Sequence, residues 1–357
     1  MMGTGEAAHG QIIQRTIAQE IEPRLPSDGI GGAAIAVRID GRTLFFNYGS
    51  ADIAHKRPIT SDSLFNLASI RKIFEATVLA QAFKRGDLAF DDPVSRYVTE
   101  LQQGGDIRRV TVGQLATHTS GLLLPADHPP WLTQPYKLAE FTRTLNEWKL
   151  SEGQEPGQQR IYTHAGYVLL QLVLERRFGK PISALLDDQV VAPLGLTSTI
   201  VPARAPDGRV ELALMGRAVQ GYAENGEPVG KPGDQQTYYD FPGTGQMYSS
   251  ARDLAILLAA NLGEGPTSPA LRHAMQFTQR AVFQVDVRNA QGMAWEAEDH
   301  DGIVVVDKPG GLNNSSTYIG LVPAQNLGLV ILMNRGNQYP HEFGRRFLVS
   351  LARAHAD

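Results

Sequence analysis

The sequence contains no cysteine, which excludes disulfides, thiol nucleophiles, iron–sulfur clusters and thiolate zinc sites. It also has no run of about 18 apolar residues, so we expect no membrane-spanning helix. An excess of basic residues is lacking too, since 33 Lys and Arg stand against 37 Asp and Glu, a net charge of −4. A nucleic acid is therefore not expected as the main partner, because a phosphate backbone calls for clustered basic side chains.

The start of the chain has neither a basic end nor an apolar stretch, so we do not expect it to be a signal peptide. Two interpretations stay open: a mature periplasmic chain whose signal peptide has been removed, and a cytoplasmic protein. The 357 residues are 42% hydrophobic and 20% charged, which is typical of a soluble globular protein. That length favours two lobes or one large α/β unit.

The apolar pattern predicts strands near both ends of the chain and helices between them. Isoleucines recur near helical spacing over 11–22, and a second helical stripe begins at about Ser69. Two short apolar runs around Asp40-Gly41 predict a β-hairpin. The Gly- and Pro-rich stretch 201–246 predicts a long loop-rich excursion. The last part of the chain predicts three strands and a closing helix, at 303–306, 315–322, 327–333 and 341–355.

This order of elements predicts an α/β fold of the α+β type. Residues 1–65 and 275–357 would form a discontinuous lobe, in which an antiparallel sheet is flanked by the N- and C-terminal helices. Residues 66–274 would form an inserted, mostly helical lobe. We expect the active site at the interface between the two lobes.

Ser69-Ile70-Arg71-Lys72 is the strongest motif and the only Ser-x-x-Lys in the sequence. At a helix start, Lys72 would lie one turn beyond Ser69 on the same face, within reach of its Oγ. A hydroxyl is a poor nucleophile until a nearby amine takes part in moving its proton. Taken alone, the motif also fits a plain helix cap.

Two further motifs gain meaning beside the first. Tyr162 precedes a helical stretch, where its phenol could enter a cleft, and two nearby cations would favour its use as a base. In Lys308-Pro309-Gly310-Gly311, the proline has no amide, so the strand edge that carries the amides of 309 and 311 should lack a strand partner. That open edge would leave the Gly311 amide available to a substrate. A buried tyrosine and a simple turn are the structural alternatives.

Together these motifs resemble the penicillin-recognising serine hydrolases, which are β-lactamases, D-Ala-D-Ala peptidases and related esterases. Ser69 and Lys72 match the first motif of that family, Tyr162-x-His164 its Tyr-x-Asn, and Lys308-Pro309-Gly310 its Lys-Thr-Gly. Several landmarks resemble the class C β-lactamases in order and spacing: 46–49, 91–94, 115–121, 292–296 and 337–340. No Gly-x-Ser-x-Gly elbow occurs, which argues against an α/β-hydrolase.

The resemblance implies hydrolysis of a β-lactam, a small molecule, through an acyl-Ser69 intermediate by a monomer that needs no cofactor. Lys72 and Tyr162 would relay the proton, and the amides of Ser69 and Gly311 would form the oxyanion hole. Lys308 would attract the substrate carboxylate. An esterase or a D-Ala-D-Ala peptidase on the same scaffold is the first alternative, and a non-catalytic penicillin-binding sensor is the second.

Several substrate-binding positions depart from the family pattern. His164 stands in place of an Asn, Pro309 in place of Thr or Ser, and His341 near a usual carboxylate-contacting Asn, whereas Gly310 is retained. An imidazole titrates near neutral pH, so His164 predicts a limb at about pH 6–7 in the activity profile. The nine histidines show no His-Glu-x-x-His and no close pair of metal spacing, so no metal site is expected.

Overall fold

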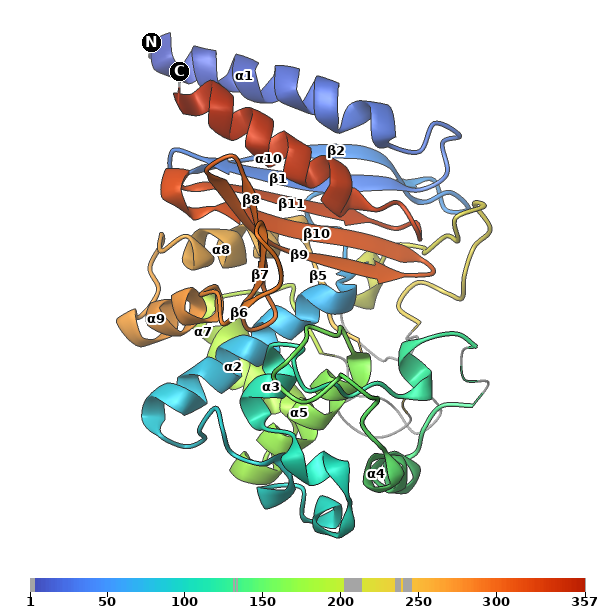
Figure 1. Ribbon diagram of the computed structural model, residues 1–357. Helices are drawn as coiled ribbons and strands as arrows, with labels where there is room; N and C mark the ends of the chain where they lie inside the picture. Colours follow the sequence, from blue (N-terminus) through green and yellow to red (C-terminus); the bar gives the residue numbers. More distant parts are fainter. Residues whose placement is uncertain are drawn as a thin grey trace.

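A computed structural model describes residues 4–130, 132, 134–201, 214–234, 239 and 246–356. In this part of the chain, an antiparallel sheet of nine strands has the order β3-β2-β1-β11-β10-β9-β8-β7-β6. The strands nearest the chain ends thus lie side by side at its centre (Figure 1). The strand bounds are Gly32–Ile39 (β1), Arg42–Asp52 (β2), Arg57–Pro58 (β3), Phe283–Gln284 (β6), Asn289–Gln291 (β7), Glu296–His300 (β8), Ile303–Leu312 (β9), Ser315–Val322 (β10) and Leu327–Met333 (β11).

Helices cover both faces of the sheet. Among the described residues, every α-helix except the first and the last lies between Phe65–Asn66 (β4) and β6 in the sequence. A small two-stranded sheet pairs β4 (Phe65–Asn66) with β5 (Tyr248–Ser249). The α-helices are Thr4–Glu20 (α1), Arg71–Arg85 (α2), Val112–Ala116 (α3), Leu138–Glu147 (α4), His164–Phe178 (α5), Ile182–Leu186 (α6), Ala192–Leu194 (α7), Ala251–Asn261 (α8), Pro269–Thr278 (α9) and Pro340–Ala356 (α10).

Two hydrophobic cores lie on opposite faces of the sheet. Successive residues of a strand point to opposite faces, so Ile35 and Val37 of β1 pack with the terminal helices α1 and α10, whereas Ala34 and Ala36 face the helical part. Figure 1 shows α1 and α10 together above the sheet and α2 and α5 below it. The predicted α+β fold, with an antiparallel sheet flanked by the terminal helices, is confirmed.

The predicted elements agree with the structure in type and differ in some bounds. The hairpin around Asp40-Gly41, β10 and β11 lie where they were predicted. The first helix begins at Thr4 rather than near residue 11. The prediction missed its first two turns because residues 4–10 carry no apolar stripe from which a helix could be predicted. The lobe boundaries at 65/66 and 274/275 stay a prediction, and α9 runs across the second of them.

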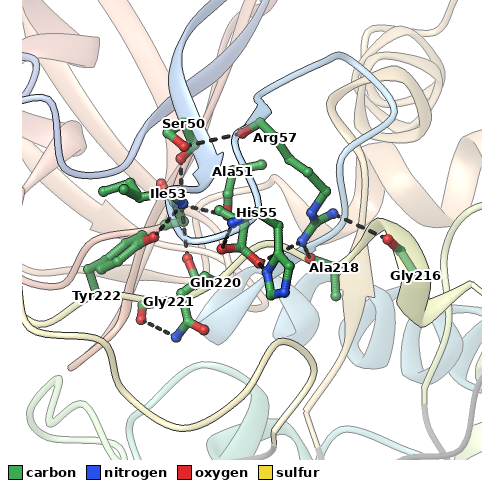
Figure 2. A network of polar contacts seen from close by, with 12 residues as sticks. Ser50, Ala51, Ile53, His55, Arg57, Gly216, Ala218, Gln220, Gly221 and Tyr222 are labelled. Carbon is green, nitrogen blue, oxygen red and sulfur yellow. Dashed lines mark hydrogen bonds and ion pairs between the residues drawn. The ribbon is translucent and has the colours of Figure 1, made fainter.

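The described part of the loop-rich stretch is fixed to the end of β2 by a polar network (Figure 2). Arg57 donates to the carbonyls of Gly216 and Ala218, at 3.2 and 2.7 Å, and the Tyr222 hydroxyl accepts from the Ile53 amide at 3.0 Å. These bonds anchor residues 216–222 to the sheet. The rest of the predicted excursion, 202–213, 235–238 and 240–245, lies outside the described residues.

Asp52 is the charged centre of this network and is 2% exposed. Its carboxylate lies 2.7 Å from His55 Nδ1 and 3.4 Å from an Arg57 nitrogen, and it also accepts from the His55 amide. Burial alone would raise the pKa of Asp52, but hydrogen bonds from His55 and Arg57 outweigh it and lower the pKa. A depressed pKa contributes stability above the unfolded value of about 4, which is lost as the pH falls through the folded value.

We expect Asp52→Asn to lower the free energy of unfolding by about 1–3 kcal/mol at pH 7, because buried donors lose a charged acceptor. The difference from wild type should shrink as the pH falls below about 4. Urea unfolding at pH 7 and at a pH below about 4 measures this difference. Asp91→Asn, at an exposed position, is the control. An equal loss at pH 7 and at acid pH would show that the charge of Asp52 is not involved.

Candidate active site

Ser69 lies in a single 3₁₀ turn, η2 (Ala68–Ile70), which leads directly into α2. The residue before it, Ala68, has a φ of +48°, a left-handed conformation that a non-glycine residue adopts only when its surroundings hold it there. Hydroxyls of β10 provide that hold, because Ser315 Oγ and Thr317 Oγ1 donate to the carbonyls of Asn66 and Leu67 at 2.8 and 2.9 Å. The central sheet therefore fixes the serine turn.

The structure brings Ser69, Lys72 and Tyr162 together. Ser69 Oγ lies 2.6 Å from the Tyr162 hydroxyl, and Lys72 Nζ donates to the same Oγ at 3.3 Å. Lys72 reaches it from the first turn of α2, as the Ser-x-x-Lys spacing predicts. A serine hydroxyl in contact with both an amine and a phenol has two routes for losing its proton.

Burial changes the protonation of Lys72. Its pKa falls from 10.5 to about 8, chiefly because burial disfavours the ammonium, with Arg71 lowering it further and Glu75 and Asp127 acting in the opposite direction. By the definition of a pKa, about a tenth of the molecules hold a neutral amine at pH 7. Lys72 is therefore able to accept a proton at physiological pH.

Tyr162 is held among rings and cations. The His118 ring lies 4.4 Å from the Tyr162 ring, centroid to centroid. The Lys308 ammonium is 4.6 Å from the Tyr162 ring centroid, and the Lys72 ammonium is 5.4 Å away. Arg160 adds a third cation at 5.7 Å. This positive surrounding favours any negative charge that develops on the phenol oxygen.

The Lys308 motif lies inside β9 and not in a turn after it. Pairing with β10 continues to Leu312, whereas β8 pairs with β9 only as far as Asp307. Among the described residues, the edge of 308–312 away from β10 thus has no strand partner, as Pro309 predicted. Tertiary pairing overrides the weak strand propensity of a Pro-Gly-Gly sequence here.

Gly310 is the point where the strand meets the serine turn. A Cβ at this position would lie 2.9 Å from the Leu67 carbonyl and 3.0 Å from the Ser69 nitrogen, and closer still to Thr317 Oγ1. Only glycine allows this approach. At Gly311, by contrast, a Cβ would meet no atom within 4 Å.

His164 does not have the titration that the sequence predicted. Its ring stands edge-on to the Tyr162 ring with centroids 5.4 Å apart and lines the cleft. Burial, followed by the charges of Lys72 and Lys308, lowers the pKa of His164 to about 3. The expected limb at pH 6–7 from His164 is therefore wrong, because the imidazole stays neutral well below that range.

Asp127 is a residue that the sequence analysis missed. It accepts from the amides of His164 and Ala165 at 2.6 and 3.1 Å and from Thr163 Oγ1 at 3.0 Å, so it holds the start of α5. Burial raises the pKa of Asp127 from its usual value, although these bonds oppose that effect. It lies 37 positions before His164, too far apart for a local capping pattern to reveal.

One cleft contains every predicted site residue except the buried Lys72. His341, at the start of α10, and Pro309 face it together with the catalytic candidates. Arg160 and Glu296, which form an ion pair, were not predicted, because a lone charged residue in a loop or strand normally faces solvent. The full lining is Ser69, Arg160, Tyr162, His164, Glu296, Lys308, Pro309, Gly310, Gly311, Ser316, Asn337, Tyr339, Pro340 and His341.

Two further findings concern the described residues only. No three His, Asp or Glu side chains gather there as metal ligands. Within the same ranges, no helix combines the length and the apolar character that crossing a membrane requires.

Comparison with known proteins places the chain in a family. The model of the Beta-lactamase family matches residues 13–354. The chain belongs to the Beta-lactamase family. A β-lactamase of Pseudomonas fluorescens is 27% identical over 363 residues, covering 92% of this chain and 95% of that protein. One of Yersinia enterocolitica is 28% identical over 360 residues, covering 90% and 86%.

Solved structures of the family share the fold over nearly the whole length. The class C β-lactamase from Rhodobacter sphaeroides has a TM-score of 0.77 and 28% identity, covering 98% of this chain and 99% of that one. A protein from Pseudomonas syringae, described as a β-lactamase/D-alanine carboxypeptidase, has a TM-score of 0.78 and 25% identity, covering 96% and 98%. The predicted resemblance to class C β-lactamases is confirmed.

The contrast between two neighbouring glycines tests the approach of β9 to the serine turn. We expect Gly310→Ala to lower the free energy of unfolding by about 1–3 kcal/mol, since the added methyl group overpacks the contact with η2. Gly311→Ala, which meets open space, should unfold like the wild type within about 0.5 kcal/mol. Urea unfolding of both variants measures this difference, and equal stabilities would show that the close contact does not constrain the turn.

Proposed function

We propose that the protein is a class C-like serine β-lactamase that hydrolyses the amide of β-lactams through an acyl-Ser69 intermediate. The observation that carries the proposal is the contact of Ser69 Oγ with both the Tyr162 hydroxyl and the Lys72 amine, at 2.6 and 3.3 Å. Membership of the Beta-lactamase family supports it. The curated relatives reported above are β-lactamases by name.

In the acylation step, Ser69 Oγ attacks the lactam carbonyl. Its proton leaves through Tyr162 and the neutral Lys72 amine and is delivered to the lactam nitrogen as the C–N bond breaks. The amides of Ser69 and Gly311 stabilise the oxyanion, an element whose loss typically costs about 10²–10³ in rate. The close approach of Gly310 to the Ser69 nitrogen supports this pairing of amides.

In the deacylation step, a water near Tyr162 attacks the ester carbonyl and gives its proton to the same relay. The bond between the acyl carbon and Ser69 Oγ then breaks, the relay returns a proton to Oγ, and the product acid leaves. The Lys308 ammonium stands over the Tyr162 ring and attracts the substrate carboxylate. His164, Pro309, Gly310 and His341 contact other parts of the substrate from the walls of the cleft. Side chains and backbone amides supply the whole mechanism, so no cofactor is needed.

A D-Ala-D-Ala peptidase or esterase on the same scaffold is the second candidate. The similar Pseudomonas syringae structure, described as both a β-lactamase and a D-alanine carboxypeptidase, favours keeping it. Intact mass separates the two: a long-lived penicilloyl adduct would indicate a slow penicillin-binding enzyme, and rapid turnover without an adduct a β-lactamase. A protein that neither hydrolyses nor becomes labelled would be a non-catalytic sensor.

We further propose that the protein acts as a monomer in the periplasm, as the family resemblance implies. Light scattering of the purified protein tests the first statement, and cell fractionation tests the second.

The proposed mechanism depends on the Ser69 hydroxyl. We expect Ser69→Ala to reduce hydrolysis of a chromogenic cephalosporin by at least about 10³-fold and to abolish the covalent adduct, because it removes the hydroxyl that contacts both Tyr162 and Lys72. Hydrolysis is followed by absorbance and the adduct by intact mass. Near-native hydrolysis by this variant would rule out the acyl-serine route.

The pH profile tests the assignment of the proton acceptor. Since the pKa of Lys72 is about 8 and that of His164 about 3, the acylation rate should rise with pH up to a limb near pH 8. His164→Asn should leave that limb in place. Stopped-flow acylation between pH 5 and 9 measures it, and a limb at pH 6–7 that disappears in His164→Asn would contradict the assignment.

A further inference from the structure

A buried ion pair flanks Lys72 on α2 and has no part in the mechanism above. Arg71 Nε lies 2.7 Å from Glu75 Oε1, and the two side chains are only 7% and 1% exposed. Glu75 lies three positions after Lys72, on the same side of α2, and Arg71 is joined to it by the ion pair. The pair is thus part of the immediate electrostatic surroundings of the serine.

Helix α5 holds the pair from the other side. Gln171 Nε2 donates to Glu75 Oε1 at 2.6 Å. Tyr167, one turn earlier on α5, places its ring 5.5 Å from Lys72 Nζ, and its hydroxyl is fixed on the Ala116 carbonyl at 2.8 Å. The same face of α5 therefore contacts both Lys72 and Glu75. Glu75 Oε1 thus accepts from both Arg71 and Gln171.

Stability does not explain why such a pair is buried. Removing two charges from water is costly, and a buried pair often stabilises a fold no better than apolar residues of the same volume. Its electrostatic effect on a neighbouring ionisable group, however, is large when water is excluded. The natural object of that effect is Lys72, because Tyr167 and Gln171, one turn apart on α5, contact Lys72 and Glu75 respectively.

We propose that Arg71 and Glu75 act as a positioning pair that sets the charge state of Lys72 and thereby the pH range in which Ser69 is acylated. The statement about acylation rests on the proposed function, whereas the statement about Lys72 does not. Removing the Glu75 carboxylate alone should favour the neutral amine. Removing the Arg71 cation as well should shift the balance back towards the ammonium.

The other groups around Lys72 come from several elements and stay in place in such variants. Besides Arg71 and Glu75, the polar and charged groups that interact with Lys72 are Ser69, His118, Asp127, Tyr162, His164 and Tyr167, and Lys308 stands over the same Tyr162 ring. Both histidines have a pKa below the usual range because they are buried, so they stay neutral while Lys72 titrates. After burial, Glu75 has the largest effect on the pKa of Lys72, and Arg71 follows with the opposite sign.

The experiment measures the titration of Lys72 directly, by NMR of protein labelled with [ε-¹³C]lysine. The chain has only eight lysines, and Lys72→Ala assigns the signal. We expect Glu75→Gln to lower the Lys72 midpoint by about one pH unit, as expected when an opposite charge within about 4–6 Å is removed. In Arg71→Met/Glu75→Gln, the midpoint should rise again from that value. The limb of the acylation profile should follow both shifts.

A partial recovery of the midpoint from the single to the double variant separates electrostatics from damage, because a structural fault would grow or persist in the double variant. Glu264→Gln, which removes a carboxylate from Arg38 on the sheet, is the matched control and should leave Lys72 unchanged. Equal midpoints in wild type, Glu75→Gln and the double variant would overturn the proposal, as would a double variant lower than the single one.

If Glu75→Gln does not fold, the double variant alone decides. Glu75 acts on Lys72 more strongly than Arg71 does, so the loss of both should lower the midpoint below that of wild type. An unchanged midpoint would overturn the proposal. A wild-type protein that no β-lactam acylates would instead refute the proposed function, while the NMR titration would still test the role of the pair.

Discussion

The burial of the Lys72 amine against Ser69 Oγ is the constraint on which the rest of the site depends. In water, the amine would be protonated at neutral pH and could not accept a proton, and a serine without a proton acceptor would be a poor nucleophile. Burial of the Lys72 side chain of α2 against α5 disfavours its charge and brings its pKa to about 8. The hydrophobic core on that face of the sheet, which includes Ile73 and Tyr167, is therefore also part of the chemistry.

Keeping that contact requires three distant segments to meet with little freedom. The sheet fixes the serine turn through hydroxyls of β10 and the glycine contact at Gly310. Asp127 fixes the start of α5, and with it the segment that carries Tyr162 and His164. The site thus lies where β9, the start of α2 and the start of α5 converge.

Some of this arrangement could be predicted from the sequence because the signals were local. The Ser69–Lys72 spacing is a property of one helical turn, and the missing amide of Pro309 belongs to a single residue. Even the start of α2 and the bounds of β10 and β11 follow from continuous apolar patterns. Signals of this kind need no knowledge of what packs against them.

The contacts that could not be predicted join residues far apart in the sequence. Asp127 bonds to backbone amides 37 positions later, and Gln171 reaches Glu75 across 96 positions. From the sequence, His164 was expected to titrate as a free imidazole does. Its burial and the two neighbouring ammonium groups, which lower its pKa, cannot be seen in a motif. The identity of a titratable residue can be predicted from sequence, whereas its charge state is a property of the packed structure.

The cleft consequently divides its basic groups into two kinds. Lys308 and Arg160 lie around the Tyr162 ring, with their cationic groups 4.6 and 5.7 Å from its centroid. His118 and His164 are buried beside the same ring and stay neutral, so they add shape without competing for the proton. Burial lowers the pKa of Lys72 to about 8, near neutrality. In the proposed mechanism, the buried amine that contacts Ser69 Oγ therefore controls when the serine becomes a nucleophile.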